Sequence, residues 1–526
     1  MRMIPPRFAA MLIMFTALAV SAPARASDFD VQAYVEKYRL ADSSLNGGAG
    51  YALLKDSGNL AWGESYVLND YYMLWSVTKD PCWIDKMMQH IDMMLSTMAH
   101  REELKAARTF SDKEIEDLAK AIAGRASLVS LENKDANGYL VWPAEYPGWA
   151  SPDYSTAAAR LIESKSQQCT VTIDPPLIKD LGRAKQVTGH DYHLVFYEGP
   201  FYAIGDYTAD TMLVKWKEYR PGEAINDIPG FSLKVEWTPK AQDEFVVRTI
   251  AQRPLQFVVH DGAIIYPMAR FIEAVKSSPE LQGRFGSKAE SYLKVITGTV
   301  PRKWEPSWTE FPETSSGSYR FLESPAELYP GSLLPLNQNN AMGRALLVLS
   351  SPSLGASALL ADKAKKIARY FKNYLLTQGT GWYWNYGGVN FAAHENHPED
   401  AGHAITDVGF AIEAYHRGVE FTREDMVRFA KTLLDTMWNG SLDSPQFGGY
   451  INNKGGDGWN NPYFGRHWIE LCEFDPAVWD ACSAWFKTRG EPVSYIPSLL
   501  YAQDIYRRTW KKTAASSPAR GHNGGK

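Results

Sequence analysis

The stretch Asn396 to Gly418, NHPEDAGHAITDVGFAIEAYHRG, joins a loop rich in acids and imidazoles to an apolar helical pattern. Glu399, Asp400 and His403 stand just before Ile405 to Tyr415, where apolar residues recur at helical spacing. The first N–H groups of a helix lack intrahelical partners and carry partial positive charge, so carboxylates and anionic ligands are stabilised there. The stretch therefore predicts a helix start, which is either simply capped by its acids or part of a functional site.

A similar unit recurs along the chain at a period of roughly 40 residues. Each unit has a polar or aromatic loop, an amphipathic helix, a short break with Pro or Gly, and a second helix. The units are Ala61 to Met98, His260 to Gly298, Asn337 to Leu376, Glu399 to Trp438, and a last pair near Pro476 to Trp510. Because one pair of helices cannot bury its own apolar face, neighbouring pairs must stack. We therefore predict a mainly α-helical protein, an (α/α) toroid that forms an incomplete or closed barrel of helical hairpins.

One segment departs from the helical pattern. From about residue 190 to 250, apolar and polar residues alternate, as in YHLVFYEGPFYAIGDYT (Tyr192 to Thr208), with Gly and Pro between the runs. This alternation predicts a small β-rich insertion. We expect a signal peptide at 1–26, a toroid domain at 27–510 that contains the insertion, and a disordered tail at 511–526.

The N-terminus has the features of an export signal. Arg2 and Arg7 precede the apolar run Phe8 to Val20, and Ala24-Arg25-Ala26 has the form of an A-x-A cleavage site. The run is too short for a membrane span, which needs about 18 or more apolar residues. We expect a bacterial protein that is cleaved near Ser27, is periplasmic or secreted, and has no membrane partner.

Composition and motif spacing limit the function further. The net charge of −5 argues against a nucleic-acid partner, which normally requires a basic surface. Four cysteines (Cys82, Cys169, Cys472 and Cys482) fit either disulfides or buried thiols. Neither CxxC nor HExxH occurs, and we expect no cofactor and no metal.

Polar and aromatic side chains gather at the starts of the helical units and in two loops. Aromatics make up 13% of the chain, and those in loops are suited either to stacking on flat ligand faces, such as sugar rings, or to packing over helix ends. In a toroid the inner helices share a direction, so the unit starts should converge at one end of the cavity, although helix capping alone also favours such residues. The candidate substrate-binding residues are Trp62, Glu64, Tyr66, His260, Tyr266, Asn337, Gln338, Trp384, Tyr386, His397 and Trp459.

Three motifs together resemble a known family. LPLNQNNAMGRALLVLS (Leu334 to Ser350), the WYWNYGG loop and EDAGHAITDVGFAIEAY, in that order, look like the alginate-lyase-type (α/α) toroid proteins, in particular polysaccharide lyase family 38. The resemblance covers about Val259 to Trp510. It implies a carbon–oxygen lyase that cleaves a β-1,4-linked polyuronate, such as glucuronan or the polymannuronate of alginate, by β-elimination. An acidic polysaccharide would then be the substrate.

Such a reaction needs a group that neutralises the uronate carboxylate, a base and an acid. Arg466, Asn337, Asn339 and a protonated Glu399 are candidates for the first role. In a syn mechanism one tyrosine serves as base and then as acid, and we expect His403 to assist Tyr450 or Tyr463 in this role. Between these two tyrosines the residues give no choice.

Three alternatives stay open. A glycoside hydrolase would use two carboxylates, drawn from Glu399, Asp400, Glu64 or Asp261. A uronyl C5-epimerase has a similar helical domain. A non-catalytic polysaccharide-binding protein would keep the aromatics but would not need the histidine, tyrosine and arginine. The polyuronate, the endo or exo mode of cleavage and the oligomeric state are left open.

Overall fold

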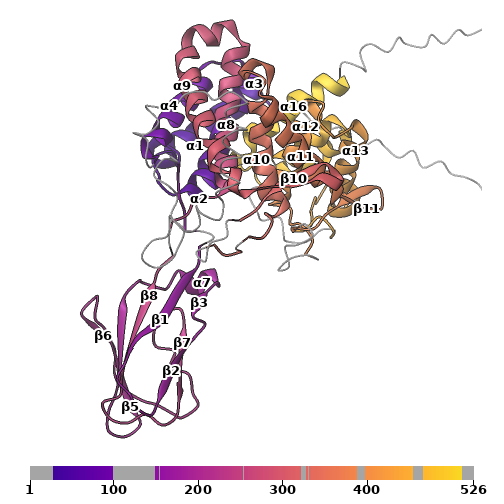
Figure 1. The fold of residues 1–526 in the computed structure, drawn as a ribbon. Coiled ribbons are helices and arrows are strands. Elements are labelled where there is room, and N and C mark those ends of the chain that lie inside the picture. Colours follow the sequence, from indigo (N-terminus) through magenta and orange to yellow (C-terminus); the bar gives the residue numbers. More distant parts are fainter. Residues whose placement is uncertain are drawn as a thin grey trace, which may run out of the picture.

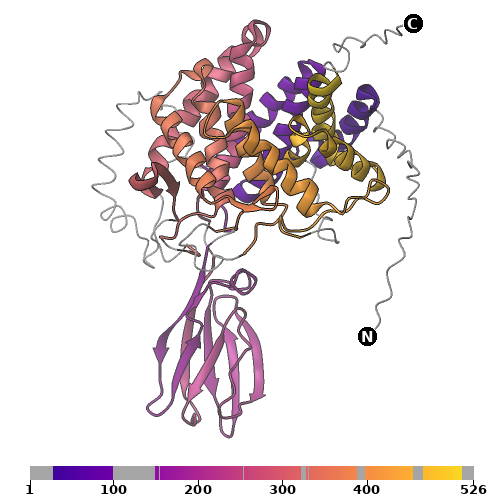
Figure 2. The same ribbon diagram turned by 90° about the vertical axis from the view of Figure 1, so that its right-hand side faces the viewer.

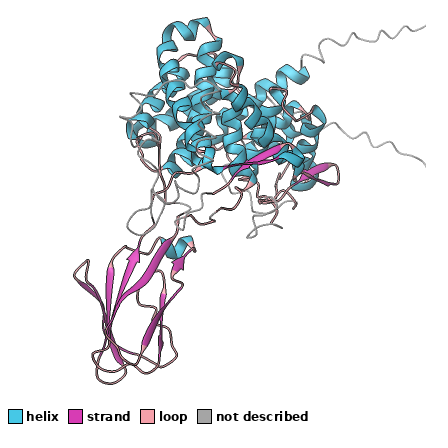
Figure 3. Ribbon diagram, in the orientation of Figure 1, coloured by secondary structure: helices cyan, strands magenta, loops and turns pink. Residues whose placement is uncertain are grey.

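A helical body and a strand-rich unit make up the protein, and the strand-rich unit projects from one end of the body (Figure 1). Figure 2 shows the same separation from the side, and Figure 3 shows that nearly all of the body is helical. The computed structural model describes residues 28–98, 148–152, 155–252, 254–321, 327–329, 331–387, 397–453 and 466–511. The prediction of a mainly helical chain is confirmed.

The body contains α-helices from distant parts of the chain. They are α1 (Val31–Ser44), α2 (Ser57–Asn59), α3 (Ser65–Thr78), α4 (Cys82–Thr97), α8 (Val258–Ser277), α9 (Pro279–Lys303), α10 (Leu336–Leu349), α11 (Ala358–Asn373), α12 (Ala404–His416), α13 (Arg423–Lys431), α14 (His467–Glu470), α15 (Pro476–Thr488) and α16 (Ile496–Tyr506). Short π-helical segments are η2 (Leu60–Glu64), η7 (Thr432–Met437) and η11 (Arg507–Lys511). Short 3₁₀ segments are η1 (Leu45–Gly48), η4 (Glu305–Ser307), η5 (Pro312–Thr314), η6 (Pro352–Leu354), η9 (Leu471–Glu473) and η10 (Val493–Tyr495).

The helices pack as hairpins, as the repeating sequence units predict. Helix α3 contacts α4, α8 contacts α9, α10 contacts α11, and α12 contacts α13. The first helix of each hairpin also contacts the first helix of the next one, through α3, α8, α10 and α12, and the series continues through α14 and α16 back to α3. Helix α10 is buried along its whole length, which explains why LNQNNAMGRALLVL is polar only near its start and at one later arginine.

Local sequence signals begin several of these helices. Thr422 and Asp425 form a reciprocal capping box at α13, where each side chain accepts from the other residue's backbone N–H. Ser278 caps α9 and Ser357 caps α11 more simply, because the hydroxyl oxygen of each accepts one backbone N–H of the first turn. Short-range capping therefore sets where these helices begin, while their apolar faces decide how they stack.

The projecting unit consists of two antiparallel sheets. Its strands are β1 (Ala157–Ser164), β2 (Thr170–Asp174), β3 (Leu177–Ile178), β4 (Asp191–Phe196), β5 (Phe201–Asp206), β6 (Thr211–Glu218), β7 (Ser232–Glu236) and β8 (Glu244–Ile250), with a short helix α7 (Leu181–Ala184). One sheet has the order β3-β1-β8-β4-β5-β6 and the other pairs β2 with β7. The two sheets share an apolar core that is separate from the core of the helical body. The strands begin at Ala157, earlier than the expected range of about 190 to 250.

Two short β-hairpins pack against helices of the body. They are β9 (Trp308–Phe311) with β10 (Ser316–Tyr319), and β11 (Leu376–Gln378) with β12 (Gly381–Tyr383). Strand β10 packs against α11, and β12 packs against α13. Among the residues that the structure describes, no helix is both long and apolar enough to cross a bilayer. All four cysteines are unpaired thiols, and Cys472 and Cys482 are buried.

Candidate functional site

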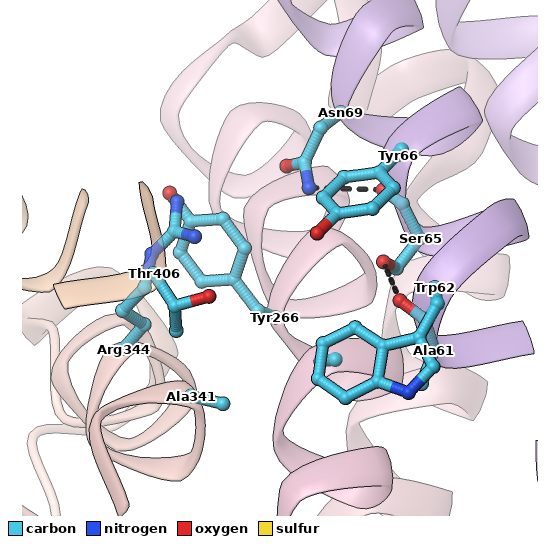
Figure 4. A pocket seen from close by; sticks show the side chains of 10 residues that line it. Ala61, Trp62, Ser65, Tyr66, Asn69, Tyr266, Ala341, Arg344 and Thr406 are labelled. Atoms are coloured by element: carbon cyan, nitrogen blue, oxygen red, sulfur yellow. Dashed lines mark hydrogen bonds between the residues drawn. The ribbon is translucent and has the colours of Figure 1, made fainter. Parts of the chain in front are cut away.

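A recess opens between the first helices of three successive hairpins and α12. Its empty volume of about 340 Å³ includes the solvent at its mouth. Segment η2 and helix α3 form one wall, α10 and α12 form the opposite wall, and α8 lies between them (Figure 4). The lining residues are Ala61, Trp62, Ser65, Tyr66, Asn69, Ala263, Tyr266, Ala341, Arg344 and Thr406. Unit starts that are far apart in sequence therefore do meet, and three of the predicted aromatics are among them.

The first wall presents two aromatic rings, those of Trp62 and Tyr66, which are both half-buried. Below Tyr66, the guanidinium of Arg466 lies 4.3 Å from the ring centroid and forms an ion pair with Asp70 at 2.8 Å. Arg466 was expected to meet a ligand carboxylate, but its charge is already matched by Asp70. Arg466 packs against Tyr66 and is not among the residues that line the recess.

The opposite wall carries Arg344 stacked on Tyr266. The guanidinium carbon lies 4.0 Å from the ring centroid, and only 8% of Arg344 is exposed. Tyr266 donates its hydroxyl hydrogen to Glu413 Oε2 at 2.9 Å, which fixes the ring. Burial raises the pKa of Tyr266 to about 12, so the hydroxyl stays protonated at neutral pH.

Gly409 makes room for this arrangement. A Cβ atom at this position of α12 would lie 3.1 Å from the Arg344 guanidinium carbon and 2.7 Å from the ring of His467. His467, at the start of α14, hydrogen-bonds Glu470 at 2.7 Å. Burial and the nearby Arg344 charge lower the pKa of His467, so this imidazole is neutral. Arg344 is thus held against apolar and neutral groups on the recess wall.

The acidic loop before α12 lies next to the recess. His403, half of whose side chain is exposed, pairs through Nδ1 with Asp400 Oδ2 at 2.5 Å, and the same atom lies 3.8 Å from Glu399 Oε1. Asp400 Oδ1 also accepts hydrogen bonds from the backbone N–H groups of Gly402 and His403, in the turn just before α12. The recess residue Thr406 donates its backbone N–H to the carbonyl of His403 at 3.0 Å, so loop and recess are one turn apart.

Beneath this loop lies a pair of buried carboxyl groups. Asp407 accepts hydrogen bonds from Asn340 Nδ2 at 2.7 Å and Trp384 Nε1 at 2.9 Å. Burial raises the pKa of both Glu399 and Asp407, and for Glu399 the charges of Asp407 and Asp400 add to the effect. Burial acts to lower the pKa of His403, but the hydrogen bond to Asp400 and the acidic charges outweigh it, and the pKa is raised.

Several predicted site residues have structural roles instead. Asn339 is fully buried and bonds Ser318 Oγ and the backbone N–H of Tyr319, which anchors β10 on α10. Glu64 is fully buried and accepts from Tyr51 N–H while it pairs with His90. His260 hydrogen-bonds Ser57 at 2.8 Å, and burial lowers its pKa to about 3.

The remaining candidates that the structure describes lie outside the recess. Asn337 and Gln338 are buried on α10, and the Trp384 ring is fully buried. Tyr386 packs its ring 5.3 Å from that of His403, and the rings of His397 and Tyr450 lie 5.6 Å apart on the surface near the same loop. Asp261, a hydrolase candidate, is paired with Lys303 at 2.6 Å. Tyr463 and Trp459 lie outside the described residues.

We did not predict Arg344, Thr406 or Asp407 as site residues from the sequence. The only available signal was a lone charge in the apolar part of α10, at GRALLVL, because a charge is rarely buried without a partner. The ring contacts and the missing partner of Arg344 arise from other helices and cannot be deduced from α10 itself.

Comparisons with known proteins give no family for the chain. No protein-family model matches it, and a search of curated proteins returns no match. The solved structures that are returned include FlgL from Xanthomonas campestris, which is 11% identical over 59% of this chain and 94% of that one, with a TM-score of 0.16. The flagellar junction protein FlgL from Legionella pneumophila is 14% identical over 63% of this chain and 95% of that one, with a TM-score of 0.16. Likenesses this weak assign neither a fold nor a role.

The expected membership of polysaccharide lyase family 38 is contradicted. No family model matches the chain, and so none for a lyase family does. The polyuronate lyase activity, the enzyme class, the role in alginate or glucuronan breakdown and the acidic polysaccharide partner are corrected with it. The structure gives a physical reason, since motif residues such as Asn339 and Trp384 are engaged in packing the helices.

Proposed function

We propose that this protein binds a small organic anion, without chemical conversion, in the recess between α3, α8, α10 and α12. The observation that carries the proposal is Arg344. Its side chain is nine-tenths buried at the recess wall, and it forms no hydrogen bond and no ion pair with any residue that the structure describes. A ligand carboxylate would supply the acceptors that this guanidinium lacks.

The two neighbouring arginine–tyrosine stacks show what Arg344 lacks. Arg270 lies 4.2 Å from the Tyr72 ring centroid and pairs with Glu413 at 2.8 Å. Arg466 lies over Tyr66 and pairs with Asp70. A guanidinium has five N–H donors in a planar fork that fits a carboxylate, and a buried charge without a partner is costly. Of these three arginines, Arg344 is the one that forms no ion pair with a described residue.

The other recess residues restrict the ligand's shape. Trp62 and Tyr66 face Tyr266 across the recess and offer flat apolar surfaces (Figure 4). Asn69 and Thr406 add polar groups at the edge. A compact ring that bears one carboxylate can stack on these faces while the carboxylate meets Arg344.

Benzoate, with benzamide as its neutral isostere, tests the proposal. We expect calorimetry and saturation-transfer NMR on the full chain to show benzoate binding that benzamide does not match. Cyclohexanecarboxylate and acetate extend the series, because they keep the anion and change the flat face. Benzoate and benzamide binding equally well, or no binding by any carboxylate in the series, would refute the proposal.

Arg344→Gln should weaken benzoate binding about 10- to 100-fold, since hydrogen bonds to a charged group contribute about 1.5–3 kcal/mol. The matched control is Arg428→Gln. Arg428 also stacks on an aromatic ring, 3.4 Å from the Trp382 centroid, but it lies on α13 and outside the recess. We expect this control to bind benzoate as the wild type does.

We also infer that the helical hairpins form an (α/α) toroid around the recess. The unbroken series of contacts from α3 through α8, α10, α12, α14 and α16 to α3 supports this arrangement. At the point of closure, Ser498 Oγ of α16 lies 3.7 Å from Met73 Sδ of α3. Cysteines at these two positions should form a disulfide under oxidation, whereas an open array would leave them reduced.

Export of the chain and its division at 27–510 remain part of this proposal. Residues 1–27 and 512–526 lie outside the described part of the chain. The support is the charged and apolar N-terminal pattern that ends at Ala26. Mass spectrometry of the protein recovered from the periplasm or medium of a bacterial host should find an N-terminus near Ser27.

A further inference from the structure

The loop before α12 brings an imidazole and two carboxylates to one point. Glu399, Asp400 and His403 each offer a ligand atom, and these atoms all lie within 4.8 Å of one another. His403 Nδ1 lies 2.5 Å from Asp400 Oδ2 and 3.8 Å from Glu399 Oε1. The spacing of these three residues is E-D-x-x-H, which differs from the HExxH zinc motif.

Glu399 supplies a second, independent observation. Its side chain is fully buried, and its Oε2 has no hydrogen-bond partner among the described residues. Its Oε1 accepts only the backbone N–H of Asp400. The nearest carboxyl groups, those of Asp400 and Asp407, are acids as well. The ion-pair partner of this buried acid among the described residues is His403, at 3.8 Å from Oε1, and its second oxygen, Oε2, is left open.

From this geometry we infer that Glu399, Asp400 and His403 form a binding site for a divalent transition-metal ion such as zinc. Zinc accepts both imidazole nitrogen and carboxylate oxygen, and open zinc sites have three protein ligands with a position left for water. An imidazole ligand favours zinc over magnesium or calcium, which prefer oxygen ligands alone. The half-exposed His403 gives the ion a route from solvent.

The surroundings of the three residues support their orientation. Asp400 is held by two backbone N–H groups, and Tyr386 packs against the His403 ring. When the ion binds, His403 Nδ1 gives up the proton that it shares with Asp400 and uses the lone pair for the metal. This proton, together with any proton held by the Glu399 carboxyl, leaves to solvent, and no oxidant or reductant is needed. The site is separate from Arg344, so zinc binding and anion binding can fail independently.

The test is a zinc titration of the full chain after treatment with a chelator, followed with a competing chromophoric chelator. We expect one zinc site in the wild type, and a large excess of magnesium should not displace the ion. His403→Gln and Asp400→Asn should each weaken binding by about 100-fold or more, because even loss of an outer-shell partner costs about 10- to 100-fold. Arg344→Gln should leave zinc binding unchanged.

His416→Gln is the matched control. His416 also pairs with a carboxylate, Glu473 at 2.9 Å, and 43% of its side chain is exposed, close to the 50% of His403. A stray surface histidine would bind zinc equally at both positions. Zinc affinity that is the same in His403→Gln as in the wild type, an equal loss in both histidine variants, or competition by magnesium would overturn the inference.

A measurement on the wild type guards against misfolded variants. Diethyl pyrocarbonate modifies accessible histidines, and peptide mass spectrometry locates the modification. Zinc should protect His403 and leave His416 reactive. Modification of His403 at the same rate with and without zinc would refute the site, even if neither variant folded.

Discussion

Helix α12 has a buried glutamate at each end, and the two have opposite surroundings. Near its C-terminal end, Glu413 accepts from Arg270 at 2.8 Å, Arg417 at 2.7 Å and Tyr266 at 2.9 Å. Just before its N-terminal end, Glu399 meets other acids and has an oxygen without a partner. The first glutamate is neutralised by the protein, whereas the second is left for an external partner.

The pKa values express this difference in charge. Burial would raise the pKa of Glu413, but Arg270 and Arg417 outweigh it and lower the pKa to about 2. At Glu399 burial and the neighbouring acids act in the same direction and raise the pKa. A glutamate within α12 is therefore structural, and one in the loop before α12 is available for binding, because two arginines, Arg270 from α8 and the nearby Arg417, pair with Glu413.

The largest effect should come from Glu413→Gln. Removing the charge leaves Arg270 buried without its anion and Arg417 with Glu273 as its remaining partner, which costs about 3–5 kcal/mol of the free energy of unfolding at pH 7. Urea unfolding followed by circular dichroism measures it. Glu290→Gln is the control, because Glu290 pairs with Lys276 on the surface, and such pairs contribute about 0–1 kcal/mol. Equal losses in the two variants would remove the distinction between the ends of α12.

The pH dependence of that loss comes next in size. The pKa of Glu413 is about 2 in the folded chain and about 4.3 when unfolded, so its contribution is fully present above about pH 4.3 and is lost as the pH falls toward 2. The shift corresponds to about 3 kcal/mol. The difference in unfolding free energy between wild type and Glu413→Gln should therefore shrink from pH 5 downward. A difference that stays constant over this range would contradict the pairing with arginine.

Gly409→Ala should have an intermediate effect. The new Cβ would lie 2.7 Å from His467 and 3.1 Å from Arg344, and overpacking of this kind costs about 1–3 kcal/mol. Because Arg344 must shift, benzoate binding should weaken as well. Gly283→Ala on α9, where nothing lies within 4 Å of the new Cβ, is expected to stabilise the helix by about 0.5–1 kcal/mol. Thermal unfolding of the two variants in parallel separates crowding from helix propensity.

The smallest effect on stability should come from Glu399→Gln in metal-free protein. The change removes a buried acid whose ion pair with His403 is long, at 3.8 Å, so the unfolding free energy should change by less than about 1 kcal/mol or rise. Added zinc should stabilise the wild type, because an ion that binds only the folded chain shifts unfolding by mass action, and should not stabilise the variant. A loss as large as that of Glu413→Gln would show that Glu399 is a structural anion.

Much of the scaffold could be read from local patterns. The helical hairpins at 61–98, 260–298, 337–376 and 399–438 were predicted from period and breaks, and the structure has helices α3/α4, α8/α9, α10/α11 and α12/α13 there. Strand alternation was recognised only from about 190, because β1 and β2 carry many polar and exposed residues that hide the period. The meeting of Trp62, Tyr66 and Tyr266 was likewise anticipated from the shared direction of the unit starts.

The candidate site itself was only partly predictable. The cluster of Glu399, Asp400 and His403 is contiguous in sequence, so its presence at a helix start could be deduced. Arg466 looked equally available, yet Asp70, almost 400 residues earlier in the chain, already neutralises it. Arg344 looked like part of a helix interior, yet it lines the recess without a partner. Family motifs misled for the same reason, since a buried asparagine or tryptophan reads alike whether it packs or binds.

The sequence by itself determined where the helices and strands begin, which faces are apolar and where acids crowd a helix start, because these depend on neighbours within a few turns of the chain. Only the tertiary structure decided which charges are neutralised. Pairing depends on side chains from segments hundreds of residues apart, and inside the protein one such partner changes a charge from free to structural. That is why the two glutamates of α12, so similar in sequence, differ in what they can bind.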